Sequence, residues 1–456
     1  MVKAKKVKIQ YVCQSCGFVS HRWLGRCNEC GQWNSMVEER VMPSVGVMTA
    51  ADKPQTEPVA LNKIQSQAEV RIACHSTEFN RVLGRGIVPG SLALVGGDPG
   101  IGKSTLMLQE AAWLANQGLT ALYVSGEESL NQTKMRADRL RLTADQLLIL
   151  PENNLENIIA ALDQIQPKIV VIDSIQTIYS ANLQSSPGSI SQVRECAYQF
   201  LQLAKHRDIS IFLIGHVTKE GYIAGPKVLE HTVDALFLFE GDRNQFFRIL
   251  RAVKNRFGST NEIGVFEMTD KGLTDVSNPS EMFLSQRKAD EPGSVVVSIL
   301  EGTRPLLLEV QSLVSRTNYG LPQRSTTGID HKRLAMLLAV LEKRIGLKIG
   351  TFDVFVNAVG GVRIDETAAD LGIALAITSS LRNQRITPNA VLVGEIGLTG
   401  EIRPVAHIER RITEAEKLGF KGMVLPSANF RSLKNKGGIK LQPVDRLSQA
   451  VEIFIQ

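Results

Sequence analysis

Long apolar runs are missing from this chain of 456 residues. The longest uninterrupted one, residues 334–341, is far shorter than the ~18 to 20 residues that a helix needs to cross a bilayer. The opening residues, MVKAKK, are not followed by the apolar stretch of a secretory leader. We therefore expect a cytoplasmic protein with no membrane partner.

Neither sign of charge dominates, and aromatic residues are scarce. There are 52 lysines and arginines against 46 aspartates and glutamates, a net charge of +6, and 5% of the residues are aromatic. With 43% apolar and 21% charged residues the composition is that of a globular protein, which excludes wholesale disorder. So small a positive excess permits a nucleic-acid partner without requiring one. The length predicts about three domains, because one hydrophobic core rarely serves more than ~250 to 300 residues.

Cysteine is also rare: the chain has six, and four of them lie within residues 13–30. They form two copies of Cys-x-x-Cys-Gly, with Cys13 and Cys16 in the first and Cys27 and Cys30 in the second. Two thiolates spaced in this way on a tight turn bind one side of a tetrahedral metal ion. Disulfides are rare in the cytoplasm, so the spacing predicts a metal site. Zinc is the expected ion, and iron with the same four ligands is the alternative.

Basic and aromatic residues accompany these cysteines. Four lysines precede Cys13, Arg22, Trp23 and Arg26 lie between the two pairs, and Trp33 follows them. Such residues suit a contact with nucleic acid or protein, and equally the solvated face of a small module.

Composition divides the chain into a cysteine-rich head, a long α/β centre and an α/β tail. We expect a metal-binding module over 1–35, a flexible linker over 36–59, a central domain over 60–278 and a tail domain over 279–456. In the centre, short apolar runs alternate with stretches of helical period, which predicts a mainly parallel sheet. Near its end, two strand-like runs flank Gly-Asp-Arg-Asn and predict an antiparallel hairpin.

A nucleotide-binding motif follows the first apolar strand of the centre. Residues 91–95 lead into Gly-Asp-Pro-Gly-Ile-Gly-Lys-Ser, and a helical stretch begins at Ser104. This is a P-loop in its required context. Its glycines let backbone N–H groups surround the phosphates of ATP or GTP, its lysine reaches the β- and γ-phosphates, and its serine binds Mg²⁺. The predicted nucleotide-binding residues are Gly97, Asp98, Pro99, Gly100, Ile101, Gly102, Lys103, Ser104 and Thr105.

Three further strands of the centre end in polar side chains. One apolar run ends in Asp173, which we expect to hold Mg²⁺ together with Ser104. Another leads to Glu127 and Glu128; we expect Glu127 to orient the attacking water, with Glu128 as the competing choice and an acidic helix start as the structural alternative. A third ends in His216, either a sensor of the γ-phosphate or a surface histidine.

With the segment 81–90 (RVLGRGIVPG) ahead of its P-loop, the centre resembles the RecA-type ATPase core of recombinases and replicative helicases. The order of parts is more specific: a four-cysteine head, this core, Lys-Asn-Arg-Phe-Gly at 254–258, and a tail similar to the Lon protease domain. It resembles the RadA (Sms) family of bacterial DNA-repair proteins over essentially the whole chain. The resemblance implies an α/β protein with a small zinc-binding module, a RecA-like P-loop ATPase domain with a mainly parallel sheet, and a Lon-protease-like domain.

The same resemblance implies a DNA-dependent ATPase that acts as a ring-shaped helicase and branch-migration factor in recombination and repair. Its implied cofactors are ATP, Mg²⁺ and Zn²⁺, and its implied partners are single-stranded and branched DNA, a RecA-type recombinase and further copies in a hexameric ring. In such cores the loops at 180–191 and 218–227 face the channel of the ring. Side chains of the second loop that suit phosphate contact and stacking are Lys219, Tyr222 and Lys227.

In RecA-type rings ATP lies between neighbours, and a basic residue of the adjacent subunit reaches the γ-phosphate. Lys254 and Arg256 are the expected residues, because they follow residues 246–253, whose hairpin partner we expect at the edge of the sheet. The alternative is a surface ion pair with a local acid such as Glu262 or Glu267.

The tail resembles the Lon protease domain around residues 366–376 and 393–404 but lacks its serine and lysine. Alignment puts Asp370 in the place of the serine and Arg411 in the place of the lysine. A carboxylate cannot supply the nucleophilic alkoxide, and a guanidinium with a pKa above ~12 cannot act as the base. We expect no proteolysis and a scaffolding role. A second DNA surface, or only a solvated helix face, is formed by Lys332, Arg333, Lys343, Arg344 and Lys348.

Two other functions stay open at this point. One is an ATP-dependent protease with a RecA-type unfoldase, which the missing serine and lysine argue against. The other is a non-motor recombination adaptor switched by ATP. The complete set of Lys103, Ser104, Asp173 and Glu127 argues against it, although a slow ATPase would carry the same four residues.

Overall fold

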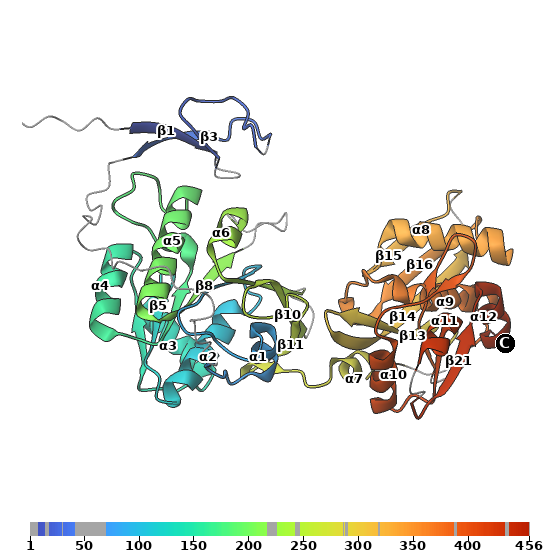
Figure 1. Ribbon diagram of the computed structural model, residues 1–456. Helices are drawn as coiled ribbons and strands as arrows, with labels where there is room; N and C mark the ends of the chain where they lie inside the picture. Colours follow the sequence, from blue (N-terminus) through green and yellow to red (C-terminus); the bar gives the residue numbers. More distant parts are fainter. Residues whose placement is uncertain are drawn as a thin grey trace, which may run out of the picture. The chain divides into compact units, whose positions relative to one another are not determined.

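The computed structural model (Figure 1) describes residues 8–13, 18–29, 31–41, 70–216, 226–241, 247–285, 287, 291–317, 320–386, 390–433 and 437–455. Contacts divide the chain into two compact units, residues 1–276 and 277–456. Within the described ranges, no helix is long and apolar enough to cross a membrane.

The cysteine-rich head is a small antiparallel sheet. β1 (Lys8–Cys13) pairs along its whole length with β3 (Met36–Val41), and its end pairs with β2 (Val19–Ser20). The head boundary expected at residue 35 is therefore too early, because β3 belongs to the head and extends it to Val41. The rest of the expected linker, 42–59, lies outside the described residues.

A nine-stranded sheet forms the core of the first unit, in the order β12-β11-β10-β9-β4-β8-β7-β5-β6. The strands from β9 to β6 in this order are parallel, and β10, β11 and β12 continue the sheet in antiparallel fashion. The parallel centre and the hairpin of β9 and β10 agree with the sequence. The strands are β4 (Leu92–Gly97), β5 (Ala121–Ser125), β6 (Leu147–Leu150), β7 (Ile169–Asp173), β8 (Ser210–His216), β9 (Ala235–Glu240), β10 (Phe247–Asn255), β11 (Ile263–Thr269) and β12 (Gly272–Asp275).

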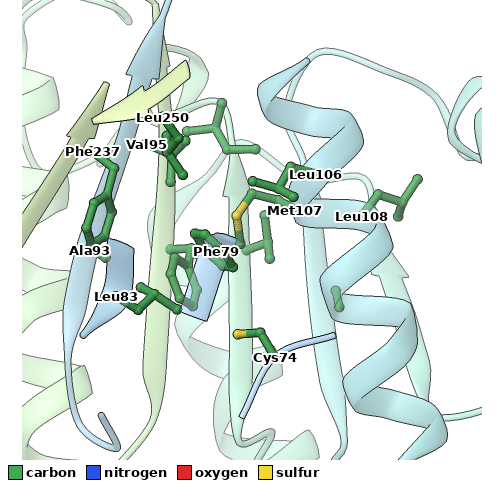
Figure 2. Close-up of a cluster of buried hydrophobic side chains, with 14 of the residues drawn as sticks. Cys74, Phe79, Leu83, Ala93, Val95, Leu106, Met107, Leu108, Phe237 and Leu250 are labelled. Atoms are coloured by element: carbon green, nitrogen blue, oxygen red, sulfur yellow. The ribbon is translucent and has the colours of Figure 1, made fainter. Parts of the chain in front are cut away.

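Helices cover both faces of this sheet, because alternate side chains of its buried strands point to opposite faces. In β4, Val95 packs into a cluster with α1 and α2, whereas Leu94 packs into another with α4, α5 and α6. Figure 2 shows the first cluster, in which Met107 of α2 points toward Phe79 of α1. The helices of this unit are α1 (Thr77–Leu83), α2 (Lys103–Asn116), α3 (Leu130–Arg139), α4 (Leu155–Ile165), α5 (Ile190–Arg207) and α6 (Pro226–Thr232).

The second unit is also α/β, with a mixed seven-stranded sheet in the order β15-β16-β14-β13-β17-β20-β21. These strands are β13 (Ser294–Glu301), β14 (Arg304–Arg316), β15 (Arg324–Thr327), β16 (Phe352–Ala358), β17 (Ala390–Leu392), β20 (Gly422–Pro426) and β21 (Lys440–Val444), and a separate pair is β18 (Glu395–Ile396) and β19 (Ile402–Arg403). The helices are α7 (Pro279–Leu284), α8 (His331–Val340), α9 (Asp370–Arg382), α10 (Ile408–Lys417), α11 (Ser427–Ser432) and α12 (Leu447–Phe454).

Helix α9 lies unusually close to the second sheet. A Cβ atom on Gly372 would come within 2.2 Å of Val297 Cγ1 on β13, so this approach requires glycine. The buried face of α9 is accordingly rich in small and aliphatic residues between Leu371 and Ile377. This packing fixes the amino end of α9, where the resemblance to Lon places a catalytic serine.

Candidate nucleotide-binding site

The polar residues predicted from the sequence meet at one edge of the first sheet. β4, β8, β7 and β5 are neighbours and parallel, so their carboxyl ends bring together the P-loop, His216, Asp173 and the turn that carries Glu127. β8 lies between the P-loop strand and the Asp173 strand, which places His216 at the centre of the group.

The path of the P-loop depends on glycine. Gly97 has φ +150°, and a Cβ there would lie 2.9 Å from Phe239 Cβ. Gly102 has φ +117°, and a Cβ there would lie 2.9 Å from Met268 Cε. L-residues rarely adopt these conformations. The loop leads directly into the 14-residue helix α2, so the N–H groups and positive dipole end of α2 are available to phosphates.

Lys103 is the buried cation of the site. Its Nζ donates to the carbonyl oxygens of Gly97 (2.8 Å) and Asp98 (2.9 Å) and lies 3.3 Å from His216 Nδ1. Burial lowers the pKa of Lys103 to about 8, although nearby carboxylates, Asp173 foremost, oppose this shift. The ammonium is thus poorly solvated, and the negative charge of a bound triphosphate would stabilise its protonated form.

Glu127 is linked to this lysine through His216. Glu127 Oε1 lies 3.3 Å from His216 Nε2 and accepts a hydrogen bond of 2.5 Å from Ser174 Oγ. The Glu127 side chain is 43% exposed, so water reaches its carboxylate. A line of side chains therefore runs from Lys103 through His216 to the predicted general base.

Glu128, the competing choice, points to a different partner. It forms an ion pair with Arg136 of α3, whose Nη1 lies 3.8 Å from Asp173 Oδ2. The Tyr123 hydroxyl donates to the same Asp173 oxygen at 2.5 Å, and burial followed by the Asp173 charge raises the pKa of Tyr123. The sequence did not identify Tyr123 or Arg136, because the first reads as a buried strand residue and the second as a charge on a helix surface.

The donor set of this edge suits Mg²⁺ with a nucleotide. Ser104 lies in the first turn of α2, which follows β4, and Asp173 ends β7; β4 and β7 are the two strands that flank β8. Thr105 follows Ser104 on the same turn. Mg²⁺ prefers oxygen ligands of this kind and takes its remaining ones from phosphate and water.

Lys254 and Arg256 lie at the amino ends of the parallel strands, whereas the P-loop lies at their carboxyl ends. β10 runs antiparallel to β9, and Asn255 pairs with Ala235 at the amino end of β9, beside the amino end of β4. The expectation that β9, the hairpin partner of β10, is an outermost strand of the sheet is wrong, because β9 lies between β4 and β10, and β11 and β12 continue the sheet beyond β10. Lys254 also lies within β10 rather than after it.

Within the chain, both basic residues contact groups at this amino edge. Lys254 Nζ donates to the carbonyl oxygens of Glu230 (2.5 Å) and Val233 (2.8 Å), at the end of α6. Burial, and then the charge of Arg256, lower the pKa of Lys254. Arg256 Nη1 lies 3.4 Å from Asp234 Oδ1, but its side chain is 60% exposed. Arg256 is therefore available to a further partner.

The uncharged residues of the same segment hold it in place. Asn255 Nδ2 donates to the carbonyl oxygens of Val82 (3.1 Å) and Leu83 (3.3 Å), at the end of α1. A Cβ on Gly258 would lie 3.1 Å from Gly84 Cα, so the two backbones need glycine to approach each other. The sequence analysis considered only the two basic residues of this segment, so these contacts of Asn255 and Gly258 were not predicted.

Of the predicted DNA-contacting residues, Lys219 and Tyr222 lie outside the described residues, and Lys227 lies in the first turn of α6. The other predicted loop, 180–191, is held at its base. Gln192 Oε1 accepts from Ser180 N at 2.8 Å, and Gln192 Nε2 donates to three carbonyl oxygens of the loop. Residues 186–188, by contrast, are exposed.

In the head, Cys13 and Cys27 are buried in one cluster with Met36. Cys13 N donates to Phe18 O at 2.8 Å and Cys27 N donates to Gln32 O at 2.9 Å, so each cysteine donates to the carbonyl five residues ahead. Two buried cysteines with equivalent backbone bonds suit a four-thiolate metal site. The other two predicted ligands, Cys16 and Cys30, lie outside the described residues.

Two ion pairs, each with one fully buried partner, involve the residues that the resemblance to Lon aligns with its serine and lysine. Asp370 begins α9, receives a hydrogen bond of 2.8 Å from Arg333 Nε and accepts from Ile396 N at 3.1 Å. Burial raises the pKa of Asp370, and the bond from Arg333 opposes this rise. Including Arg333 in an exposed basic surface was therefore wrong. The residues of that set that are exposed are Lys332, Lys343, Arg344 and Lys348.

The second pair joins Arg411 and Glu366. Arg411 is fully buried, donates to Ser298 O at 2.6 Å and forms an ion pair with Glu366 Oε1. Glu366 Oε2 also accepts from Leu300 N at 2.7 Å. Both positions are thus filled by side chains that hold the fold together.

Three segments match known protein families. Residues 11–38 match the rubredoxin metal binding domain, residues 58–222 an AAA domain, and residues 315–429 the subunit ChlI of Mg-chelatase. The expected fold, a zinc-ribbon head, a RecA-like P-loop ATPase domain and a Lon-like α/β domain, is thereby confirmed.

Relatives resemble the chain from end to end. A DNA repair protein RadA from Halalkalibacterium halodurans is 50% identical over 99% of both chains, one from Bacillus subtilis is 50% identical over 98% of both, and one from Listeria monocytogenes is 48% identical over 99% of both. A solved KaiC-like protein from Pyrococcus horikoshii is 18% identical with a TM-score of 0.40, covering 46% of this chain and 100% of that one. The full-length matches alone decide the family: the chain belongs to the RadA family of DNA repair proteins, which carry an ATPase domain.

Proposed function

We propose that this chain is a DNA-dependent ATPase that works as a ring-shaped helicase and branch-migration factor in homologous recombination. One observation carries the proposal: His216 contacts both Lys103 and the predicted base Glu127, and it ends the strand that leads into residues 217–225. Those residues contain most of the loop expected to bind DNA. In this proposal, a change at the γ-phosphate reaches the start of that loop through His216.

The residues at the carboxyl edge divide the chemistry among them. The P-loop amides and Lys103 bind the phosphates, and Ser104 and Asp173 hold Mg²⁺, which when bound neutralises charge on the phosphate oxygens. Glu127 orients the attacking water, since it is exposed and close to Lys103 through His216, whereas Glu128 is paired with Arg136. Tyr123 and Arg136 position the Asp173 carboxylate.

We further propose that Lys254 and Arg256 act on the nucleotide of a neighbouring subunit. The length of β4, roughly 17 Å at ~3.3 Å per residue, separates them from the P-loop of their own chain. Head-to-tail interfaces repeated by rotation close into a ring, which for this family we take as a hexamer.

The head is proposed to hold one structural Zn²⁺ through Cys13, Cys16, Cys27 and Cys30, in keeping with the burial of Cys13 and Cys27 and their equivalent backbone bonds. Single-stranded and branched DNA and a RecA-type recombinase are the proposed partners, and the cytoplasm is the proposed location. The ion pairs of Asp370 and Arg411 support a Lon-like domain without peptidase activity.

The test is ATP turnover by the purified protein with and without single-stranded DNA. We expect turnover that rises with DNA and is abolished in Lys103→Ala, because the γ-phosphate then loses its neutralising charge. Turnover that DNA leaves unchanged would contradict the DNA-driven motor, and undiminished turnover in the variant would contradict the nucleotide site.

A further inference from the structure

Two tryptophans are exposed on the head. Trp23 is 55% exposed and Trp33 is 69% exposed, although tryptophan is usually largely buried. Trp113, the other tryptophan of the chain, packs against the core of the nine-stranded sheet. Large exposed aromatic side chains mark interaction surfaces when they lie together.

The second cysteine turn brings these two rings together. Arg26 and Trp33 form an antiparallel bridge, and Asn34 N donates to Gly25 O at 2.9 Å. A Cβ on Gly25 would lie 3.5 Å from the ring of Trp23 and 4.0 Å from the ring of Trp33. Both rings therefore border one point of the surface, which glycine leaves unfilled.

Positive charge surrounds this pair of rings. The Arg26 guanidinium lies 5.8 Å from the centre of the Trp33 ring and is held there by a hydrogen bond of 2.8 Å from its Nε to Gly31 O. Arg22, next to Trp23, is exposed. Residues 1–41 contain seven lysines and arginines against three glutamates. This excess of positive charge favours a polyanion as the partner over an uncharged apolar surface.

We propose that Trp23 and Trp33 form a stacking platform for the bases of single-stranded DNA, with Arg22 and Arg26 contacting its phosphates. Two neighbouring aromatic rings accompanied by arginines can stack bases while the arginines contact adjoining phosphates, and stacking on tryptophan accepts every base. The inference rests on the proposed function, because it adds a DNA contact on the head to the loops of the ATPase domain.

Intrinsic fluorescence of the zinc-loaded full-length protein provides the first measurement. Titration with oligo(dT) should quench the emission, because a stacked base lies against an exposed indole. An oligonucleotide of the same length made only of abasic sites should bind more weakly and quench little. Trp113→Phe is the matched control and should retain the quenching.

Variants separate stacking from charge. Trp23→Ala and Trp33→Ala should each weaken oligo(dT) binding roughly tenfold, with an unchanged slope of log affinity against log salt, because no charge is lost. Arg22→Ala should reduce that slope by about one. Gly25→Ile should weaken binding as the tryptophan variants do, since it fills the space between the rings while keeping both. A zinc content equal to that of the unmodified protein shows that each variant head is folded.

The proposal is overturned if both tryptophan variants bind oligo(dT) with unchanged affinity. It is overturned in favour of a protein interface if they keep DNA affinity but no longer bind a recombinase filament. Either result, combined with ATP turnover that DNA still stimulates, would leave the proposed function standing. If DNA does not stimulate ATP turnover in the unmodified protein, that result would instead contradict the proposed function itself.

Discussion

At the residue scale, Lys103 links burial to phosphate chemistry. Its pKa is lowered to about 8 by burial, so the free lysine loses its proton as the pH rises through 8, whereas bound phosphates favour the charged form. We expect ATP binding above pH 8 to take up a proton and the affinity to fall with rising pH. Calorimetry in buffers of different ionisation enthalpy measures this uptake. The same uptake in Lys103→Ala at saturating ATP would assign the proton to another group.

Glu127 and Glu128 offer a matched comparison of neighbouring carboxylates. We expect Glu127→Gln to keep ATP bound while slowing hydrolysis on the order of a hundredfold or more, because an amide cannot act as the base. Glu128→Gln should slow it far less, since this side chain is paired with Arg136. Single-turnover hydrolysis of both variants decides the choice, and the reverse order of effects would make Glu128 the base.

Residues with strong local patterns were the predictable ones. The P-loop and Asp173 could be recognised because their strand, turn and helix follow one another in the sequence. Tyr123 and Arg136 were not predictable, because their contacts with Asp173 join residues from separate elements. Asp234, which bonds Leu92 N and pairs with Lys205 and Arg256, was missed for the same reason.

At the scale of elements, a strand buried on both faces is easier to recognise from the sequence than one buried on one face only. The first half of β14, at 306–310, is a buried apolar run of the kind that predicts a strand. Its second half alternates between exposed residues such as Gln311 and Leu313 and covered ones such as Ser312, so it has no apolar run to recognise. Pairing of this half with β16 stabilises it as strand.

The buried pair of Arg411 and Glu366 gives a prediction at this scale. Arg411→Ala should destabilise the second unit by about 3 kcal/mol, because it leaves a cavity and an unpaired carboxylate. The neighbouring Arg410→Ala, at an exposed position, should change stability by less than ~0.5 kcal/mol. All three tryptophans lie in the first unit, so hydrogen exchange of β13 and α10 in the intact protein is the suitable measurement. Equal protection in both variants would contradict a stabilising role for this ion pair.

At the scale of the whole molecule, the opposite placement of the P-loop and Lys254 predicts the outcome of mixing two inactive proteins. Lys103→Ala and Lys254→Ala should partly restore each other's ATP hydrolysis, because some interfaces then combine two intact halves. Light scattering should show particles near 300 kDa, six times the 50.0 kDa chain. No restoration at any ratio, in particles that exchange subunits, would place Lys254 away from the neighbour's nucleotide.

Domain order was the most predictable property of the molecule, because each part carries its own local signature. The position of Lys254 was predicted incorrectly, since β11 and β12 lack apolar alternation strong enough to reveal that the sheet continues past β10. The extent of the head was underestimated because β3, with two glutamates among its six residues, reads as linker rather than strand.

Because β4 separates the P-loop from the basic residues of the same chain, the rate of ATP hydrolysis would depend on the concentration of the protein. If each chain carries the phosphate-binding half of one site and the basic half of another, a solitary chain holds no complete site, however well it folds. Dilution below the dissociation constant of the assembly would then abolish ATP hydrolysis without unfolding any chain. The specific activity would rise steeply with protein concentration. A cell that makes little of such a protein keeps it inactive until copies gather, for instance on a shared DNA strand.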